Sequence, residues 1–362
     1  MTNILLSGYY GFSNTGDEAI LASTVNALRN ARPDLNIMVL SKRPGETERT
    51  YGVRAFPRMN VVEVARAVSR AGLVVFGGGS LLQDATSLRS LIYYLSIIEL
   101  SHWLGKPVVV YANGIGPISS RIGRTLTKHT LSNVKAITVR DIESKSELRN
   151  IGVLSEVHVT ADPAFLLNPS PNHIVDSILE DHGISVSQGI VWVSMRHVNS
   201  PAWFQQQLVE VIAWLRQEGF NPCFFAMQER DLKIADSLNR KLTSAGQKPM
   251  GAVSNVSPED ALGALGRGEF CLGMRLHTLI LSARVQVPFM GIEIDPKIGA
   301  FCRSAGCPVL PRPAIEPNFN IQDEFTSLMR NKDKLRQLLH RKLPEFRSLA
   351  QENIDMVLGH LG

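Results

Sequence analysis

The chain has 362 residues, 44% apolar and 20% charged, values typical of a soluble globular protein with room for two domains. No apolar run reaches the roughly 18 residues of a membrane-spanning helix, and the first residues do not look like a secretory signal. The net charge of +5 favours acidic partners, but no block of lysines and arginines is present, so nucleic acid is not an expected partner.

The cysteines predict neither a disulfide framework nor a zinc site. Cys223, Cys271, Cys302 and Cys307 are too few and too scattered for either. We therefore expect a reducing, cytoplasmic location.

The first 170 residues alternate strand-like apolar runs with segments of helical spacing. Strands are expected at residues 3–11, 35–41, 73–79, 106–113, 136–141 and 157–165, and helices at 17–33, 61–72 and 88–105, with a further helix beginning soon after residue 80. This alternation predicts a parallel, doubly wound α/β sheet.

A break in the pattern follows at residues 166–173, "LLNPSPNH", where two prolines and two asparagines occur together. We place the domain boundary there, which gives a first domain of residues 1–170 and a second of 171–330. The pattern then restarts, with strands expected at 189–196, 221–228 and 269–275 and helices at 203–219, 231–246 and 259–268. The tail, residues 331–362, is predicted to be helical, and Pro344 is expected to kink or split it.

Three glycine-containing turns follow strands of the first domain. The first carries Asn14 and Asp17 just before a helix; Asp17 suits a sugar hydroxyl, or it caps the helix. This turn has neither the dinucleotide fingerprint nor the phosphate-loop motif. The second contains three glycines, 77–79, which indicate close approach by a ligand or by the neighbouring domain. In the third, Asn113 reads a hydroxyl or simply forms the turn. Together the three turns favour a binding site.

Cationic side chains follow apolar runs of the second domain. Arg196 ends one expected strand, Arg275 and His277 follow another two residues apart, and Lys297 follows a third. Two arginine forks, a lysine and a proton-shuttling histidine would suit a small dianion or trianion. The alternatives are an ion pair of Arg196 with an acid such as Glu229, a capped core pair for Arg275 and His277, and a plain surface lysine.

The motifs "GYYGFSNTGDEAIL", "VFGGGSLLQD", "YANGIGP", "VRD", "TADPAF", "GMRLHTLI" and "DPKI" together resemble the polysaccharide pyruvyl transferases, from Ser7 to about Phe301. The resemblance implies a glycosyltransferase-B-like fold of two Rossmann-like domains, with a C-terminal helix that returns to the first domain. Within the family, the chain is most similar to enzymes that pyruvylate a lipid-linked secondary cell wall polymer precursor, whose product anchors surface-layer proteins.

The resemblance also implies the reaction and the residues that carry it. Members transfer a pyruvyl group from phosphoenolpyruvate to a sugar as a 4,6-linked ketal, without a cofactor or metal. The donor-binding residues by position are Arg196, Arg275, Leu276, His277 and Lys297. The acceptor-binding candidates are Asn14, Asp17, Gly78 and Asn113. The catalytic candidates are His277, Arg275 and, as the base for the sugar hydroxyls, Asp17.

The expected acceptor is N-acetylmannosamine on a polyprenyl diphosphate at the inner face of the membrane. The basic segment 119–129, "SSRIGRTLTKH", either rests on that membrane or is a solvated helix face. Two other functions stay open. One is a sugar-nucleotide-dependent glycosyltransferase of the same fold, with Glu293 gripping the ribose. The other is a non-catalytic glycan-binding or regulatory protein, which would leave the buried cations unexplained.

Overall fold

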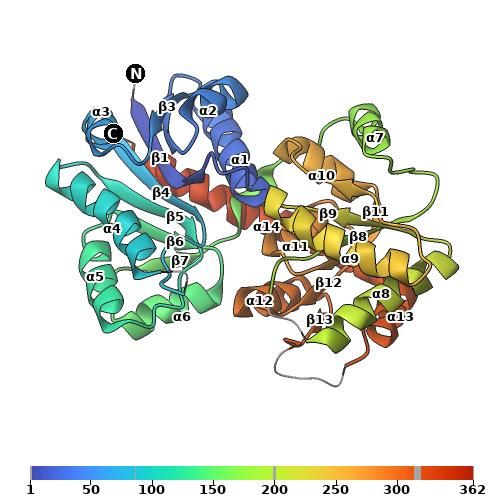
Figure 1. Cartoon of the computed structure of the whole chain (residues 1–362). Coiled ribbons are helices and arrows are strands. Elements are labelled where there is room, and N and C mark those ends of the chain that lie inside the picture. The colour runs from blue at the N-terminus through green and yellow to red at the C-terminus, as the bar shows by residue number, and fades with distance from the viewer. Residues whose placement is uncertain (1, 86, 199–200, 314–318, 362) are drawn as a thin grey trace. The chain divides into compact units, whose positions relative to one another are not determined.

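The computed structural model describes residues 2–85, 87–198, 201–313 and 319–361. The chain divides into two compact units, residues 1–167 with 346–362, and residues 168–345 (Figure 1). The sequence analysis placed the division at residue 170 and began the tail at 331.

The first unit contains a seven-stranded sheet of order β3-β2-β1-β4-β5-β6-β7, in which all neighbouring strands are parallel. Its strands are β1 (Asn3–Tyr10), β2 (Asn36–Ser41), β3 (Arg54–Pro57), β4 (Leu73–Gly79), β5 (Val108–Asn113), β6 (Ala136–Val139) and β7 (Val157–Val159). Its helices are α1 (Thr15–Ala31), α2 (Pro44–Tyr51), α3 (Val61–Arg70), α4 (Leu88–Trp103), α5 (Arg121–Leu131), α6 (Ile142–Ile151) and the 3₁₀ turn η1 (Pro163–Leu166). The predicted parallel, doubly wound sheet is confirmed.

Each face of this sheet has its own core, because successive side chains along a strand point to opposite faces. On β1, Leu5 shares a core with apolar side chains of α3, α4, α5 and α6. Its neighbours Ile4 and Leu6 instead share a core with α1 and with the end of α14 (Lys332–Gly359). The strands are therefore buried on both faces, and most of the polar side chains lie in the loops at their ends.

The second unit contains a six-stranded parallel sheet of order β10-β9-β8-β11-β12-β13. Its strands are β8 (Ile190–Ser194), β9 (Asn221–Phe225), β10 (Ala252–Val253), β11 (Gly268–Gly273), β12 (Phe289–Ile292) and β13 (Val309–Leu310). Its helices are α7 (Asn172–Asp181), α8 (Ala202–Gln217), η2 (Glu229–Asp231), α9 (Leu232–Ser244), α10 (Pro258–Gly266), α11 (Leu276–Arg284), α12 (Pro296–Ala305) and α13 (Ile321–Arg330).

Helix α14 begins in the second unit and ends in the first. It continues through Pro344, so the expected split does not occur. Its last part is fixed to the first unit by Asn353, which is fully buried. The Asn353 amide oxygen accepts hydrogen bonds from Thr138 (2.6 Å) and Thr160 (2.8 Å), and its amide nitrogen donates to the Ala161 carbonyl (3.0 Å). The last part of α14, from residue 346 on, therefore completes the first unit.

One local expectation was wrong, and two elements of the first unit were missed. No helix begins near residue 80, since α4 starts at Leu88. Helix α2 and strand β3 were not predicted, because the α2 sequence "PGETERTY" is polar and buries only Thr47. None of the helices within the described ranges is long and apolar enough to span a bilayer.

Candidate functional site

The strand orders identify one position in each sheet where a ligand is expected. In open parallel sheets, ligands bind beyond the carboxyl ends of the strands, at the point where the chain order reverses. That point lies between β1 and β4 in the first unit and between β8 and β11 in the second. The predicted acceptor residues cluster at the first, and the predicted donor residues at the second.

In the second unit, Arg196 follows β8 and Arg275 follows β11. The two strand ends are fixed to each other, because the Met274 amide donates to the Ser194 carbonyl (2.8 Å). Desolvation, followed by repulsion from Arg275, lowers the pKa of the Arg196 guanidinium. Arg196 forms no ion pair with Glu229 or with any other residue that the structure describes. Two cations at one sheet edge therefore repel each other, an arrangement that an anionic ligand would relieve.

Arg275 has an acid partner that the sequence analysis missed. Its guanidinium donates to the carboxylate of Asp231, which follows β9 on η2 and is 1% exposed. Because β8 lies between β9 and β11, the Arg275 side chain must cross the end of β8 to reach Asp231. The other carboxylate oxygen of Asp231 accepts from the Gln228 amide (3.2 Å). The arginine is thus held across the switch point and does not project freely.

Leu276 and His277 form the first turn of α11, and Arg275 is its N-cap. Both side chains are partly exposed. The turn is fixed to the ends of β8 and β9. The buried Thr278 hydroxyl lies 2.8 Å from the Ser194 hydroxyl, which donates to the Phe225 carbonyl (2.9 Å). The free amides at a helix N-terminus attract an anion, so this turn adds to the positive field of the arginines.

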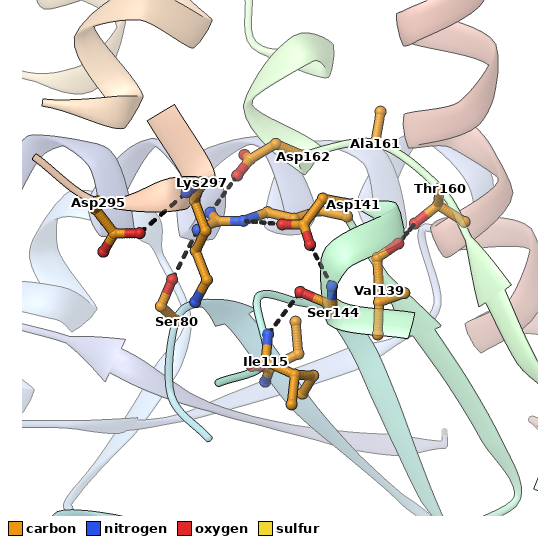
Figure 2. Close-up of polar contacts among 12 residues, drawn as sticks. Ser80, Ile115, Val139, Asp141, Ser144, Thr160, Ala161, Asp162, Asp295 and Lys297 are labelled. Atoms are coloured by element: carbon orange, nitrogen blue, oxygen red, sulfur yellow. Dashed lines mark hydrogen bonds and ion pairs between the residues drawn. The ribbon is translucent and has the colours of Figure 1, made fainter. Parts of the chain in front are cut away.

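Lys297 lies in the first turn of α12, after β12. Its backbone amide donates to the Asp295 carboxylate (3.0 Å), which caps the helix (Figure 2). Strand β12 is the neighbour of β11, so Lys297 starts from the adjacent strand end. Glu293, which the alternative function would use to bind the ribose, follows β12 and instead pairs with Arg303 of α12 (3.5 Å).

In the first unit, Asn14 rather than Asp17 caps α1. The Asn14 side-chain oxygen accepts from the Gly16 amide (3.3 Å), and its amide donates to the Asp17 carboxylate. The capping alternative for Asp17 was therefore wrong. Asp17 lies inside the helix and is 6% exposed.

The three glycines at the end of β4 are required by packing within the first unit. All three have positive φ. A Cβ at Gly77 would overlap the Tyr111 carbonyl, one at Gly78 would overlap Ile20, and one at Gly79 would lie 2.5 Å from the Asp17 carboxylate. Elements β5 and α1 thus approach these glycines and account for them by packing, and approach by a ligand stays a prediction. A role for Gly78 in acceptor binding stays a prediction.

Asn113 ends β5 opposite Gly79 and is fully buried. Its side-chain oxygen accepts from the Leu81 amide (3.4 Å), while its amide nitrogen has no partner among the residues described. Asn14, Asp17, Gly78 and Asn113 thus belong to one edge of one sheet, at the ends of β1, β4 and β5.

The sequence analysis assigned no role to a buried ion pair at the same edge. Arg140, after β6, donates to Asp162, after β7 (2.7 Å), and to the Ser80 hydroxyl (2.8 Å), after β4 (Figure 2). Burial alone would lower the pKa of Arg140, but the carboxylates of Asp162 and Asp141 outweigh it and raise that pKa. The signal was present in "AITVRD" and "TADPAF", where charged residues directly follow apolar strands.

Solved structures share this architecture at low sequence identity. UDP-bound MnaA of S. aureus matches with a TM-score of 0.67 and 12% identity, over 98% of this chain and 95% of that chain. A UDP-GlcNAc 2-epimerase from Neisseria meningitidis matches with a TM-score of 0.65 and 11% identity, over 99% and 100%. A glycosyltransferase from Rickettsia africae matches with a TM-score of 0.66 and 10% identity, over 99% and 98%. These likenesses establish the two-domain, glycosyltransferase-B-like α/β fold.

Sequence comparison identifies the family. No curated protein matches the chain. The model of the polysaccharide pyruvyl transferases matches residues 14–296, which is most of the chain and includes all the site residues named above except Lys297. The chain is therefore a member of the polysaccharide pyruvyl transferase family.

Proposed function

We propose that this protein transfers a pyruvyl group from phosphoenolpyruvate to N-acetylmannosamine in a lipid-linked cell wall polysaccharide precursor. The product is a 4,6-linked ketal, and phosphate is released. In this proposal the enzyme belongs to the branch of the family whose product anchors surface-layer proteins, and it works at the inner face of the cell membrane without a cofactor or metal.

One observation carries the donor assignment. Arg196, an exposed residue, and Arg275 follow the two strands at the switch point of the second sheet, where desolvation and then repulsion from Arg275 lower the pKa of Arg196. A ligand with a carboxylate and a phosphate would relieve that repulsion through two arginine forks. The amides at the start of α11 offer further donors to the same anion. Lys297 is proposed to contribute a third cation.

The reaction needs one proton transfer to carbon and two attacks by hydroxyl groups. His277 donates a proton to C3 of the enol, which makes C2 electrophilic. The first sugar hydroxyl attacks C2 and loses its proton to a base, for which Asp17 is the candidate. The C2–O bond to phosphate then breaks, and phosphate leaves with the bonding electron pair. The second hydroxyl attacks C2 and closes the ketal, and its proton leaves with the phosphate or the base.

The acceptor candidates have matching chemistry. Asn113 has an amide donor without a partner among the described residues, and Asn14 and Asp17 supply an amide and a carboxylate. Amide and carboxylate groups are suited to reading sugar hydroxyls. Asp17 is engaged by Asn14, so its action as a base requires the acceptor hydroxyl to displace or join that hydrogen bond.

A second candidate function is a sugar-nucleotide-dependent glycosyltransferase. The fold of UDP-bound MnaA favours it, because that protein is similar over nearly the whole chain. The pairing of Glu293 with Arg303 speaks against it, since this acid was the candidate for the ribose.

The decisive experiment incubates the protein with phosphoenolpyruvate and a synthetic lipid-linked disaccharide and measures the pyruvate mass added to the sugar. His277→Ala is expected to lose about 10²-fold to 10⁴-fold in rate, the usual contribution of a general acid. His158→Ala, in β7, is the matched control and should keep full activity. Near-normal turnover of folded His277→Ala would reject the assignment. Transfer from a UDP-sugar but not from phosphoenolpyruvate would establish the second candidate.

A further inference from the structure

A groove of about 560 Å³ opens at the carboxyl edge of the first sheet, on the side away from β5. We name it the β2–β3 groove. Its lining comes from the ends of β2 and β3, the residues that follow them and the start of α3: Ser41, Lys42, Pro57, Arg58, Met59, Asn60 and Val61. It adjoins the turn that carries Asn14, because Lys42 donates its backbone amide to the Tyr10 carbonyl (3.0 Å) and Arg43 donates to the Ser13 hydroxyl (3.0 Å).

The rim of this groove is unusually apolar for a surface. Met59, Val61 and Val62 are 67%, 78% and 66% exposed. They do not belong to the core, to which α3 contributes Val64, Ala67 and Val68. Single exposed apolar residues are ordinary, but three within four positions form one patch, which is typical of an interaction site.

The groove also contains a buried cation without a counter-ion. Arg58 is 5% exposed, yet it pairs with no carboxylate among the described residues. Its guanidinium donates to the Gly8 carbonyl (2.7 Å) and lies over the rings of Phe12 and Tyr93, 5.0 and 4.8 Å from their centroids. A buried charge is costly unless it is compensated, and here a carbonyl and the rings of Phe12, Tyr93 and Tyr94 compensate it in place of a carboxylate.

Lys42 adds a second positive charge at the groove mouth. It is exposed and forms no ion pair with any residue in the described part of the chain. The groove thus offers two cations beside an exposed apolar rim. Proteins that rest on anionic membranes combine these features: apolar side chains enter the interface and basic groups meet lipid phosphates.

We propose that the β2–β3 groove docks the first unit onto a membrane lipid phosphate. The phosphate meets Lys42 in the field of Arg58, and the hydrocarbon chain lies along Met59, Val61 and Val62. The choice of occupant rests on the proposed function, in which the sugar acceptor is attached to such a lipid. The groove would then hold the lipid end of the acceptor while its sugar reaches the turn of Asn14.

The test is co-sedimentation of the whole protein with vesicles. The vesicles are phosphatidylcholine alone, phosphatidylcholine with phosphatidylglycerol, or phosphatidylcholine with a polyprenyl phosphate. The wild type is expected to bind the two anionic compositions. Val61→Ser/Val62→Ser should lose on the order of tenfold in binding, since several buried methyl and methylene groups are removed. Lys42→Gln should weaken binding to the anionic vesicles alone.

A matched control exists on another helix of the same unit. Ile122 and Leu126 on α5 are 61% and 37% exposed and lie in the basic segment of residues 119–129. Ile122→Ser/Leu126→Ser should leave vesicle binding unchanged. Loss of binding in this variant, with wild-type binding by Val61→Ser/Val62→Ser, would overturn the proposal in favour of α5. Absence of vesicle binding by the wild type would overturn it as well.

Activity separates this proposal from the proposed function. Val61→Ser/Val62→Ser should turn over a water-soluble, lipid-free acceptor at the wild-type rate and the lipid-linked acceptor more slowly. Vesicle binding without pyruvyl transfer would reject the proposed function and keep the docking site. Equal use of the lipid-linked acceptor by the variant and the wild type would reject the docking site and keep the function.

Discussion

Replacement of Asp231 by asparagine isolates the effect of the carboxylate that holds Arg275. The substitution keeps the volume and removes the charge from a group that is 1% exposed. Breaking a buried ion pair by removing one partner costs about 3–5 kcal/mol, and an exposed pair costs about 0–1 kcal/mol. The Arg275 side chain is 14% exposed, so we expect a loss just below the buried range, about 2–3 kcal/mol in the free energy of unfolding.

The effect on catalysis should be larger than the effect on donor binding. Without Asp231 the Arg275 guanidinium is free to leave the end of β8, and a displacement of about 1 Å can cost 10²-fold in rate. That factor corresponds to about 2.7 kcal/mol in the activation free energy. In the wild type the Asp231 carboxylate repels the anionic donor, and the substitution removes that repulsion. We therefore expect kcat to fall about 10²-fold while KM for phosphoenolpyruvate does not rise.

Asp176→Asn is the matched control for this measurement. It makes the same change in charge and breaks the ion pair of Asp176 with Arg267, which precedes β11 at the opposite edge of the same sheet. Steady-state kinetics of both variants, at a temperature where circular dichroism shows them folded, give the comparison. If kcat of Asp231→Asn stays within about twofold of Asp176→Asn, the carboxylate does not position Arg275 for the reaction. An Arg275→Gln background should make Asp231→Asn nearly silent, because the cation that Asp231 holds is then absent.

Two further predictions concern stability. Gly79→Ala should lower the free energy of unfolding, measured by thermal melting, by about 2–4 kcal/mol, because φ is +83° and the new Cβ would lie 2.5 Å from the Asp17 carboxylate. The control Gly105→Ala, at φ +66° with open space around it, should cost only about 1 kcal/mol in the same measurement. Equal losses in the two variants would contradict the packing argument. Burial raises the pKa of the Cys223, Cys271 and Cys307 thiols to about 12, so above pH 9 the unfolded chain releases thiol protons that the native chain retains and stability falls as pH rises. Urea unfolding under reducing conditions should show a free energy of unfolding lower at pH 10 than at pH 8 by about 1.4 kcal/mol per thiol. In Cys271→Ala this difference should be smaller by the contribution of one thiol, and an unchanged pH dependence in that variant would refute the assignment.

The local pattern of the sequence was sufficient for the architecture of each half. Buried parallel strands are apolar over their whole length, and glycine, proline or polar residues mark their ends, so these signals are read within a few positions. Arg196, Arg275 and the Asn14 turn were found for the same reason, because each follows a strand directly. Their place at the carboxyl edge follows from the parallel alternation alone.

The partners of these residues were decided only by the tertiary structure. Asp231 lies 44 positions from Arg275, and nothing in the local sequence of either predicts that one crosses β8 to reach the other. Likewise, the motif "VFGGG" does not predict that the atoms packed closely against its glycines belong to Tyr111, Ile20 and Asp17. Asn353 meets Thr138 across 215 positions. Periodicity records which face of an element is buried, whereas ion pairs and close packing depend on how strands are ordered across the sheet, and that order is set by the whole fold.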